Sequence, residues 1–165
     1  MMAFRLKTLV CTSVALGLML ILSACGSAPP KPDKAHMTVA ATADVNPAAD
    51  GRASPIVLRI YQLKDNAKFN NADFFTLFDT DQQALGGDLL SREEVELTPG
   101  EKRELDFLVS GEAKYLGVLA AYRDIRNAQW RVIQAAPKSG LKNLMKKDAI
   151  SISAGRTAVT LQIKE

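Results

Sequence analysis

Histidine and cysteine are scarce in this chain of 165 residues, which contains one histidine, two cysteines and one tryptophan. The only histidine, His36, lies in a segment rich in proline and charge near the N-terminus, and we expect it to be a solvated linker residue. A Ser-His-Asp or Cys-His arrangement would have to take its general base from that segment. A zinc site would likewise need one histidine together with carboxylates. The composition therefore argues against nucleophilic hydrolysis and against a zinc centre.

The N-terminus has the features of a bacterial export signal. Basic Arg5 and Lys7 precede the apolar residues 8–22, and two small residues, serine and alanine, follow at 23 and 24. A membrane-spanning helix needs about 20 apolar residues, which is more than the 15 in this run. Residues 1–24 are therefore predicted to be a signal peptide, with a transmembrane anchor as the alternative.

Residues 22–25, Leu-Ser-Ala-Cys, match the lipobox of bacterial lipoproteins. In those proteins a thioether joins a diacylglycerol to the cysteine and the signal is cut off directly before it, so Cys25 is predicted to be an acylated N-terminus. Stable anchoring takes at least two acyl chains, and a lipoprotein cysteine typically carries three. Residue 26 is glycine and not the aspartate that retains enterobacterial lipoproteins in the inner membrane. By analogy, the outer membrane is the predicted destination.

Processing at Cys25 also changes the cysteine count and the charge. Cys11 lies within the signal, so the mature protein is expected to contain no free thiol and no disulfide. Of the 21 basic and 18 acidic residues, the signal holds Arg5 and Lys7, which leaves 19 basic residues against 18 acidic ones. This near balance gives no reason to expect nucleic acid as a partner.

A tether is predicted between the acylated cysteine and the folded domain. Residues 26–36, GSAPPKPDKAH, are rich in proline and charge and lack apolar periodicity. In polyproline geometry, at about 3.1 Å per residue, they would hold the domain roughly 30 Å from the lipid surface. The predicted organisation is a signal peptide at 1–24, an acylated cysteine with a flexible tether at 25–36, and a β-sandwich domain at 37–165.

Short runs in which apolar and polar residues alternate dominate the rest of the chain and predict β-strands. Ile56, Leu58 and Ile60 share one face of such a run, as in a strand that covers a core on one side. Residues 98–101, Thr-Pro-Gly-Glu, fit a type II turn. Strands are predicted at 38–45, 56–63, 93–97, 103–109, 115–122, 129–135, 149–153 and 157–164. Short strands at this spacing indicate a two-sheet β-sandwich of about eight strands.

One or two short helices are expected to be added to the sandwich. Within residues 70–85, Phe74, Leu77 and Phe78 recur at helical spacing after an asparagine N-cap at 70 or 71. A second short helix is predicted at 141–146. The aromatic side chains are expected to be structural: Trp130 is predicted to pack across the sandwich, and a group of phenylalanines is predicted to form a core between helix and sheet. That group comprises Phe69, Phe74, Phe75 and Phe78.

Two clusters of charge suggest binding sites but fit solvated surface better. Asp79, Asp81 and Asp88 invite a calcium hypothesis, yet the segment lacks the glycine and the glutamate that an EF-hand loop requires. A solvated helix end is the favoured interpretation. Four lysines near the C-terminus could approach anionic head groups or an acidic partner, although such a run is more often a solvated helix face. They are Lys138, Lys142, Lys146 and Lys147. No metal, cofactor or small-molecule substrate is predicted.

Several stretches together resemble a known family. DGRASPIVLRIYQLK at 50–64, ADFFTLF at 72–78, LTPGE at 97–101 and YLGVLAAYRDIRNAQWR at 115–131 resemble, in order and spacing, the outer-membrane lipoprotein of the type VI secretion system, the TssJ (SciN-like) family. The resemblance runs over about residues 38–163. It implies a transthyretin-like β-sandwich with added helices. It also implies a non-enzymatic assembly component that binds the periplasmic C-terminal region of the inner-membrane protein TssM.

The segment NPAADGRASP, 46–55, is the strongest candidate for the contact with that partner. It joins the first two predicted strands and is long for a hairpin connection, and loops on a rigid scaffold commonly carry binding. In the family that the chain resembles, the loop between the first two strands contributes to the partner contact. Carried over by position, this implies the following partner-binding residues: Asn46, Pro47, Ala48, Ala49, Asp50, Gly51, Arg52, Ala53 and Ser54.

Two other functions remain open from the residues alone. A periplasmic small-ligand-binding lipoprotein on a transthyretin-like fold is the main alternative. The related hydroxyisourate hydrolases are disfavoured, since they use histidines and a C-terminal Tyr-Arg-Gly-Ser, whereas this chain ends LQIKE. A structural lipoprotein that binds peptidoglycan is weakened by the lack of a recognisable cell-wall-binding motif.

Overall fold

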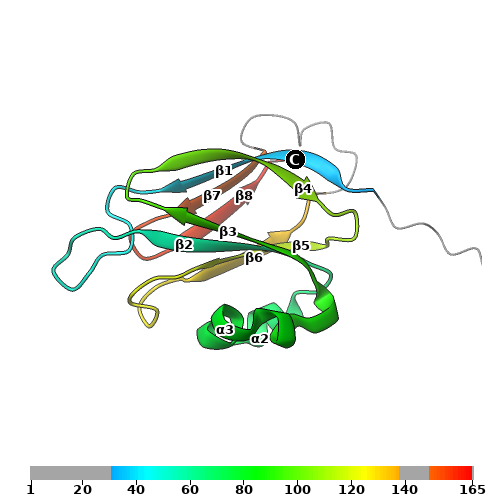
Figure 1. The fold of residues 1–165 in the computed structure, drawn as a ribbon, viewed down its shortest axis with the longest axis horizontal. Helices are drawn as coiled ribbons and strands as arrows, with labels where there is room; N and C mark the ends of the chain where they lie inside the picture. Colours follow the sequence, from blue (N-terminus) through cyan, green and yellow to red (C-terminus); the bar gives the residue numbers. More distant parts are fainter. Residues whose placement is uncertain (1–30, 138–148, 165) are drawn as a thin grey trace, which may run out of the picture.

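The computed structural model describes residues 31–137 and 149–164, which form two four-stranded β-sheets packed face to face with helices on one outer face (Figure 1). The elements follow one another as β1 (Asp33–Ala41), β2 (Ile56–Leu63), α2 (Ala67–Asn71), α3 (Phe74–Leu85), the 3₁₀ turn η2 (Gly86–Asp88), β3 (Leu89–Leu97), β4 (Lys102–Val109), β5 (Tyr115–Ala120), β6 (Arg131–Ala135), β7 (Ile150–Ala154) and β8 (Val159–Ile163). The predicted two-sheet sandwich of about eight strands is therefore confirmed.

The first sheet has the strand order β4-β1-β7-β8. Its central strand β1 pairs antiparallel with β4 and parallel with β7. Buried residues alternate along β1, from Ala35 through Met37 and Val39 to Ala41, which places one face of the strand on the core.

The start of β1 corrects the predicted tether. Residues 33–36 were assigned to a linker, but they form strand and pair with 106–109 of β4. His36 is accordingly a strand residue, and its Nδ1 lies 2.8 Å from Oδ1 of Asp106 on the neighbouring strand. The alternation of buried apolar residues begins at Ala35, but its neighbours Asp33, Lys34 and His36 are polar. The pattern of a strand is therefore not recognisable there from the sequence.

The second sheet has the order β3-β2-β5-β6 and is antiparallel throughout. Strand β2 has the predicted bounds, and Ile56, Leu58 and Ile60 are all buried between the sheets. They join one cluster with Val39, Ile152 and other residues of the facing sheet. This apolar layer between the two sheets is the main core of the domain.

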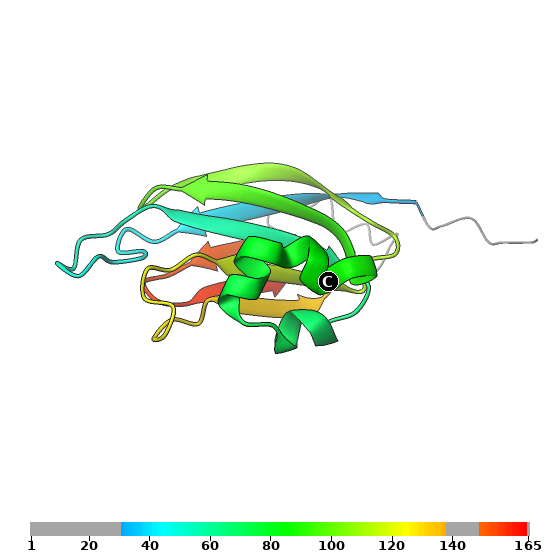
Figure 2. The ribbon, with the colours of Figure 1, turned by 60° about the horizontal axis from the view of Figure 1, so that its bottom comes forward.

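Helices α2 and α3 cover the outer face of the second sheet (Figures 1 and 2). The single helix predicted at 70–85 is in fact two, because Ala72 is extended with ψ 146° and interrupts the helical backbone. Asp73 and not an asparagine caps α3, since its Oδ1 accepts from the Thr76 N–H at 2.9 Å. The capped helix turns Phe74 and Leu77 toward the sheet, where both are buried.

A second, smaller core lies between these helices and the sheet. Phe69 and Phe74 are buried and Phe78 is half-buried, as predicted, but Phe75 is 61% exposed and was wrongly assigned to the core. Helical geometry explains the error, since Phe75 follows Phe74 directly and points about 100° away from it. Trp130 packs against both cores: it contacts the layer between the sheets, as predicted, and its ring lies edge-on to Phe74 at 5.3 Å in the smaller core.

The helix predicted at 141–146 and the four lysines of 138–147 lie outside the described residues. Within 31–137 and 149–164, none of the helices is long and apolar enough to cross a membrane. The turn at 98–101 matches its prediction: Gly100 has φ 79°, and the Glu101 N–H donates to the Thr98 carbonyl at 3.0 Å.

Candidate functional site

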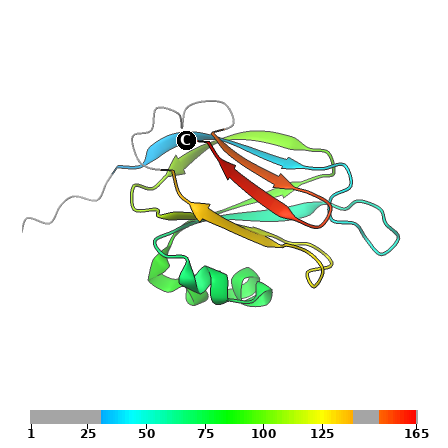
Figure 3. The ribbon, with the colours of Figure 1, turned by 180° about the vertical axis from the view of Figure 1, so that it is seen from behind.

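The connections 42–55, 98–101, 121–130 and 155–158 lie together at one end of the sandwich, here named the loop end (Figures 1 and 3). The described chain starts at the other end, where β1 begins, as the blue strand of Figure 1 shows. The sequence-predicted partner loop, 46–54, therefore projects away from the side on which the N-terminal residues join the domain.

The partner loop has a defined fold of its own. The Ala48 N–H donates to the Arg52 carbonyl at 2.8 Å, and the Gly51 N–H donates to the Ala48 carbonyl at 2.8 Å. Gly51 has φ 81°, a left-handed conformation that favours glycine. The Asp50 carboxylate accepts from the Arg52 N–H at 3.1 Å and from its Nε at 2.7 Å. These contacts give the exposed tip one preferred shape.

The same contacts favour the charged form of the Asp50 carboxylate. The hydrogen bonds from the backbone and then the side chain of Arg52 hold the pKa of Asp50 below its usual range. The Arg52 side chain is 86% exposed, so its charge is presented to solvent at the outermost part of the loop.

The base of the partner loop is buried. Asn46 is 3% exposed and Ser54 is 7% exposed, and the Ser54 N–H donates to the Val45 carbonyl at 3.1 Å. Asn46 has φ 48°, in the left-handed region that asparagine tolerates better than most residues. Its Nδ2 donates to the Pro55 carbonyl at 2.7 Å, which closes the loop across its two ends.

Asn46 also joins the partner loop to its two neighbours. Its Oδ1 accepts from the Arg123 N–H at 2.8 Å, and its own N–H donates to the Arg156 carbonyl at 3.2 Å. The Tyr122 hydroxyl in turn donates to the Gly155 carbonyl at 3.1 Å. Three connections that are distant in the sequence are thereby fixed into one surface.

A pocket of about 430 Å³ lies where these three connections meet, here named the arginine pocket. One wall comes from the partner loop and the others from 122–128 and 156–157. The lining residues are Asn46, Pro47, Ala48, Ala49, Tyr122, Arg123, Asp124, Ala128, Arg156 and Thr157. Small apolar side chains and two guanidinium groups therefore share one concave surface.

Two acidic residues lie at the arginine pocket. Asp124 lines it and accepts from Asn127 Nδ2 at 2.7 Å, a neutral donor that leaves the carboxylate charge in place, whereas Asp50 is paired with Arg52. Arg156 has one acidic neighbour, Asp44, at 3.9 Å, and both side chains are more than half exposed. Such a long exposed pair contributes little attraction, so Arg156 keeps its capacity to bind another anion.

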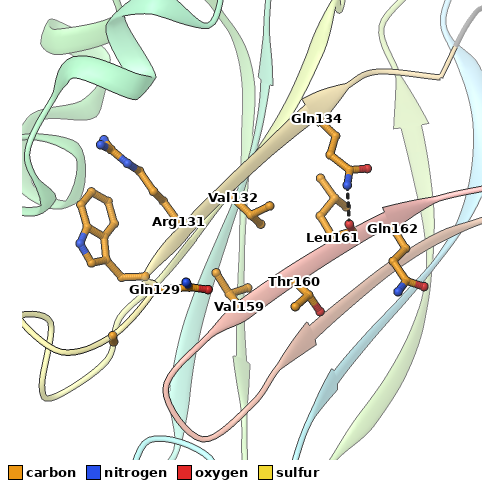
Figure 4. Close-up of a pocket in the computed structure, with 10 residues that line it drawn as sticks. Gln129, Arg131, Val132, Gln134, Val159, Thr160, Leu161 and Gln162 are labelled. Carbon is orange, nitrogen blue, oxygen red and sulfur yellow. Dashed lines mark hydrogen bonds between the residues drawn. The ribbon is translucent and has the colours of Figure 1, made fainter.

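A larger hollow of about 750 Å³ lies between the free edges of β6 and β8 (Figure 4). Next to these strands, Gln129 forms an isolated parallel bridge with Ala158. Val132, Val159 and Leu161 form an apolar floor. The Gln134 Nε2 donates to the Leu161 carbonyl at 2.8 Å and ties the two edges together a second time.

The other sequence candidates do not form a site. Asp81 is buried, 4% exposed, and its Oδ2 lies 2.7 Å from Arg92 Nη1 and 3.8 Å from Arg59 Nη1, so the solvated helix end predicted for it is wrong. Asp88 is paired with Lys68 at 2.8 Å. No group of three or more metal-ligating side chains is found in the part of the chain that the structure describes.

Sequence reasoning missed the parts of the loop end outside 46–54. Arg123 and Arg156 stand in separate connections, and nothing in the sequence places them beside Asn46, 77 residues from Arg123. The glycine, proline and asparagine content of 46–55 did signal a structured loop. The only further signal was an asparagine at the start of a long connection, a position where its side chain commonly bonds to the backbone.

The fold and this end of the molecule define a class of protein: a small β-sandwich domain that holds a composite surface of loops on a rigid frame. The chain belongs to the type VI secretion lipoprotein family, since the family model described as "Type VI secretion lipoprotein, VasD, EvfM, TssJ, VC_A0113" matches residues 33–163. This is a family of membrane-bound secretion components and not an enzyme family.

Solved structures support the assignment. The chain is 34% identical to the type VI lipoprotein TssJ1 from Pseudomonas aeruginosa, with a TM-score of 0.72 over 81% of this chain and 98% of that one. It is 28% identical to Serratia marcescens Lip, a membrane-bound component of the type VI secretion system, with a TM-score of 0.70 over 81% of this chain and 99% of that one.

A third match is to a chain in a structure described as the type VI protein TssM C-terminal domain (869–1107) from EAEC. The identity is 29% and the TM-score 0.63, over 79% of this chain and 98% of that one. No significantly similar sequence is found among curated proteins.

Proposed function

We propose that this protein is an outer-membrane-anchored, non-enzymatic assembly component of the type VI secretion membrane complex. It binds the periplasmic C-terminal region of a TssM-like inner-membrane protein through the partner loop, 46–54. The observation that carries the proposal is the placement of that loop at the end of the sandwich opposite the start of β1. A domain held by lipid at Cys25 presents this loop away from its own membrane.

The solved structures support the choice of partner. The alignment to the chain of the TssM structure spans 79% of 165 residues, about 130, which is 98% of that chain and fewer than the range 869–1107 contains. The matched chain is therefore shorter than the TssM range that the description names. A chain of a structure described as a type VI membrane complex is 30% identical, with a TM-score of 0.66 over 78% of this chain and 97% of that one.

The shape of the partner loop supports its role in binding. Its tip is already ordered by the contacts of Asp50, Gly51 and Arg52, so binding loses less conformational freedom than it would with an unstructured loop. The tip is exposed and the base is locked by Asn46 and Ser54. Such a loop can contact a partner without rearrangement of the sandwich.

A binding experiment tests the loop. Residues 48–52 are replaced by a Gly-Ser linker of equal length, with Asn46 and Ser54 kept because both are buried in the base. The mature protein is then used to pull down the periplasmic C-terminal domain of the TssM-like protein of the same organism. Binding is expected to be lost, while a matched replacement of 110–114 at the opposite end leaves it intact. Unchanged binding by the loop variant would refute the loop assignment.

A second experiment tests the anchor. Cys25→Ser removes the thiol that carries the lipid, so the protein is expected to move from the outer-membrane fraction to the soluble periplasmic fraction. Density-gradient fractionation with an outer-membrane marker measures this. A variant that stays in the outer membrane would contradict lipid anchoring at Cys25.

Small-ligand binding is a second candidate function, favoured by the two hollows of about 430 and 750 Å³, which fall in the range of ligand sites. A thermal-shift screen with periplasmic metabolites measures it directly. A saturable rise in melting temperature that Val132→Trp or Ala128→Trp removes would support this function over a purely structural role.

A further inference from the structure

The two guanidinium groups of the arginine pocket come from backbone positions that a single buried residue fixes. Asn46 accepts from the Arg123 N–H through its side chain at 2.8 Å and donates from its backbone to the Arg156 carbonyl at 3.2 Å. The two arginines belong to different connections, 121–130 and 155–158. Because both backbones are hydrogen-bonded to Asn46, the two arginines are nevertheless held at a fixed position relative to each other.

The pocket between them combines two kinds of surface. Arg123 and Arg156 supply positive charge, and Pro47, Ala48 and Ala128 supply small apolar groups. Among the described residues, no ion pair to the Arg123 side chain is found, although its charge acts at longer range on Asp50. Arg156 has only the long contact of 3.9 Å to Asp44. With two arginines against the single carboxylate of Asp124, the lining keeps an excess of positive charge. The pocket thus offers planar cationic donors beside an apolar wall, which suits a carboxylate attached to a short apolar stem.

The pocket is continuous with the proposed partner surface. Asn46, Pro47, Ala48 and Ala49 line the pocket and also belong to the partner loop, so a polypeptide that grips the loop from this side covers the pocket as well. Charge complementarity then selects the covering segment, because a basic segment would meet two arginines and lose affinity.

We propose that the arginine pocket receives an acidic segment of the partner polypeptide, in which an Asp or Glu carboxylate binds Arg123 and Arg156 while a neighbouring apolar side chain packs on Pro47, Ala48 and Ala128. This inference rests on the proposed function and adds the chemistry of the partner. Arg123 and Arg156 are the specificity-determining contacts. Asn46 is a positioning residue that holds both of them.

Charge-reversal variants of the full mature protein test this inference. Arg123→Glu and Arg156→Glu are compared with Lys114→Glu, which makes the same charge change on an exposed side chain at the opposite end of the sandwich. The probe is the periplasmic C-terminal domain of the TssM-like protein of the same organism, and titration calorimetry measures the Kd. Each arginine variant is expected to raise the Kd at least about tenfold and Lys114→Glu less than about twofold.

Two further measurements test whether a charged contact causes the loss of binding: the dependence on salt and rescue by variants of the partner. Raising the ionic strength is expected to weaken the wild-type complex more than the complexes of the two arginine variants, since the charged contact is lost in them. Lysine substitutions at the acidic residues of the partner domain, made one at a time, are expected to include one that restores binding to Arg123→Glu. Arg156→Gln, which keeps the size of the side chain, replaces Arg156→Glu if the latter lowers the melting temperature.

The outcomes separate this inference from the function on which it rests. If replacement of 48–52 abolishes binding but both arginine variants bind like the wild type, the pocket assignment is overturned and the partner loop stands. If the wild type does not bind the TssM-like domain, the proposed function fails and the inference fails with it. A free anionic metabolite that binds the wild type and is lost in Arg123→Glu, without any effect on the protein complex, also overturns the inference.

Discussion

Oδ1 of Asn46 accepts a hydrogen bond at 2.8 Å from the backbone N–H of Arg123, 77 residues further along the chain. The Asn46 side chain also donates to the Pro55 carbonyl, and its backbone N–H donates to the Arg156 carbonyl. One buried residue therefore connects the base of the partner loop to both neighbouring connections. The stability of the domain and the shape of its loop end are thereby coupled at a single residue.

Removing the Asn46 side chain is expected to destabilise the domain. Asn46→Ala loses the two side-chain hydrogen bonds. It also leaves alanine at φ 48°, a left-handed conformation that the asparagine contacts no longer offset. The two effects together are expected to cost about 2–3 kcal/mol. Asn46→Gly loses the same bonds but adopts that φ freely, so its loss is expected to be smaller by about 1 kcal/mol. Urea unfolding of the two variants measures both values, and equal losses would contradict a role for the left-handed backbone.

Gly117 permits the close approach of helix α2 to the second sheet. A Cβ at this position would lie 3.0 Å from the Phe69 ring, which is fully buried. Gly117→Ala is therefore expected to cost about 1–3 kcal/mol through overpacking. Gly87→Ala is the matched control, because nothing lies within 4 Å of its added Cβ. Thermal unfolding compares the two variants. A Gly117 variant as stable as the control would show that helix α2 can move away from the sheet without loss of stability.

Asp81 is the buried carboxylate that pairs with Arg92 on β3 and lies near Arg59 on β2. Its Oδ2 contacts Arg92 at 2.7 Å, and Arg59, whose side chain is 12% exposed, lies near it and donates to the Phe78 carbonyl. Asp81→Asn leaves Arg92 without its carboxylate, while Arg59 keeps its pair with Glu94 at 2.6 Å. The substitution is expected to cost about 1.5–3 kcal/mol. Exposed Asp79→Asn is the control and should change stability by less than about 0.5 kcal/mol.

The same variant has a spectroscopic readout. Burial and then the Asp81 charge raise the pKa of Tyr61 to about 12. Asp81→Asn removes the second cause, so the pKa of Tyr61 is expected to fall while burial still holds it above 10. Ultraviolet titration of the tyrosinates measures the change. An unchanged Tyr61 titration would show that the Asp81 charge does not affect the pKa of Tyr61.

Glu101 gives the turn at 98–101 a dependence on acid. Hydrogen bonds from the Thr98 N–H, the Arg103 side chain and the Thr98 hydroxyl lower the pKa of Glu101 from 4.5 to about 2. Because the folded pKa is depressed, the carboxylate stabilises the fold fully above pH 4.5 and loses this contribution as the pH falls toward 2. Urea unfolding of wild type and Glu101→Gln is expected to differ at pH 7 and to converge as the pH falls below 4.5. A difference that stays constant from pH 7 to pH 2.5 would exclude the carboxylate charge as its cause.

The strands were predictable because most of them alternate clearly. Strand β2 begins and ends as predicted, since Ile56, Leu58 and Ile60 mark the buried face without interruption. Strand β1 was placed too late along the chain because polar residues surround Ala35, and only the pairing with β4 makes them strand. A central strand that starts with charged residues cannot be recognised from periodicity alone.

The candidate site was predictable only where it is local in sequence. Residues 46–55 carry turn residues and unusual length, which signal a structured connection. The arginine pocket needs Arg123 and Arg156 beside Asn46, and that proximity arises from the strand order of both sheets. The burial of Asp81 likewise depends on cations from β2 and β3, which the helix sequence does not contain.

The position of β1 between the proposed lipid attachment site and the partner loop has a mechanical consequence. A pull exerted on the loop by a partner and resisted at Cys25 would run along this one strand, which is hydrogen-bonded to β4 on one side and to β7 on the other. Those hydrogen bonds are roughly perpendicular to the strand, so tension loads them in shear and they must yield together. A pull on the C-terminal edge strand β8 would instead peel away its single partner β7, one bond after another. The two proposed attachment points therefore flank, at its two ends, a strand that is paired on both sides.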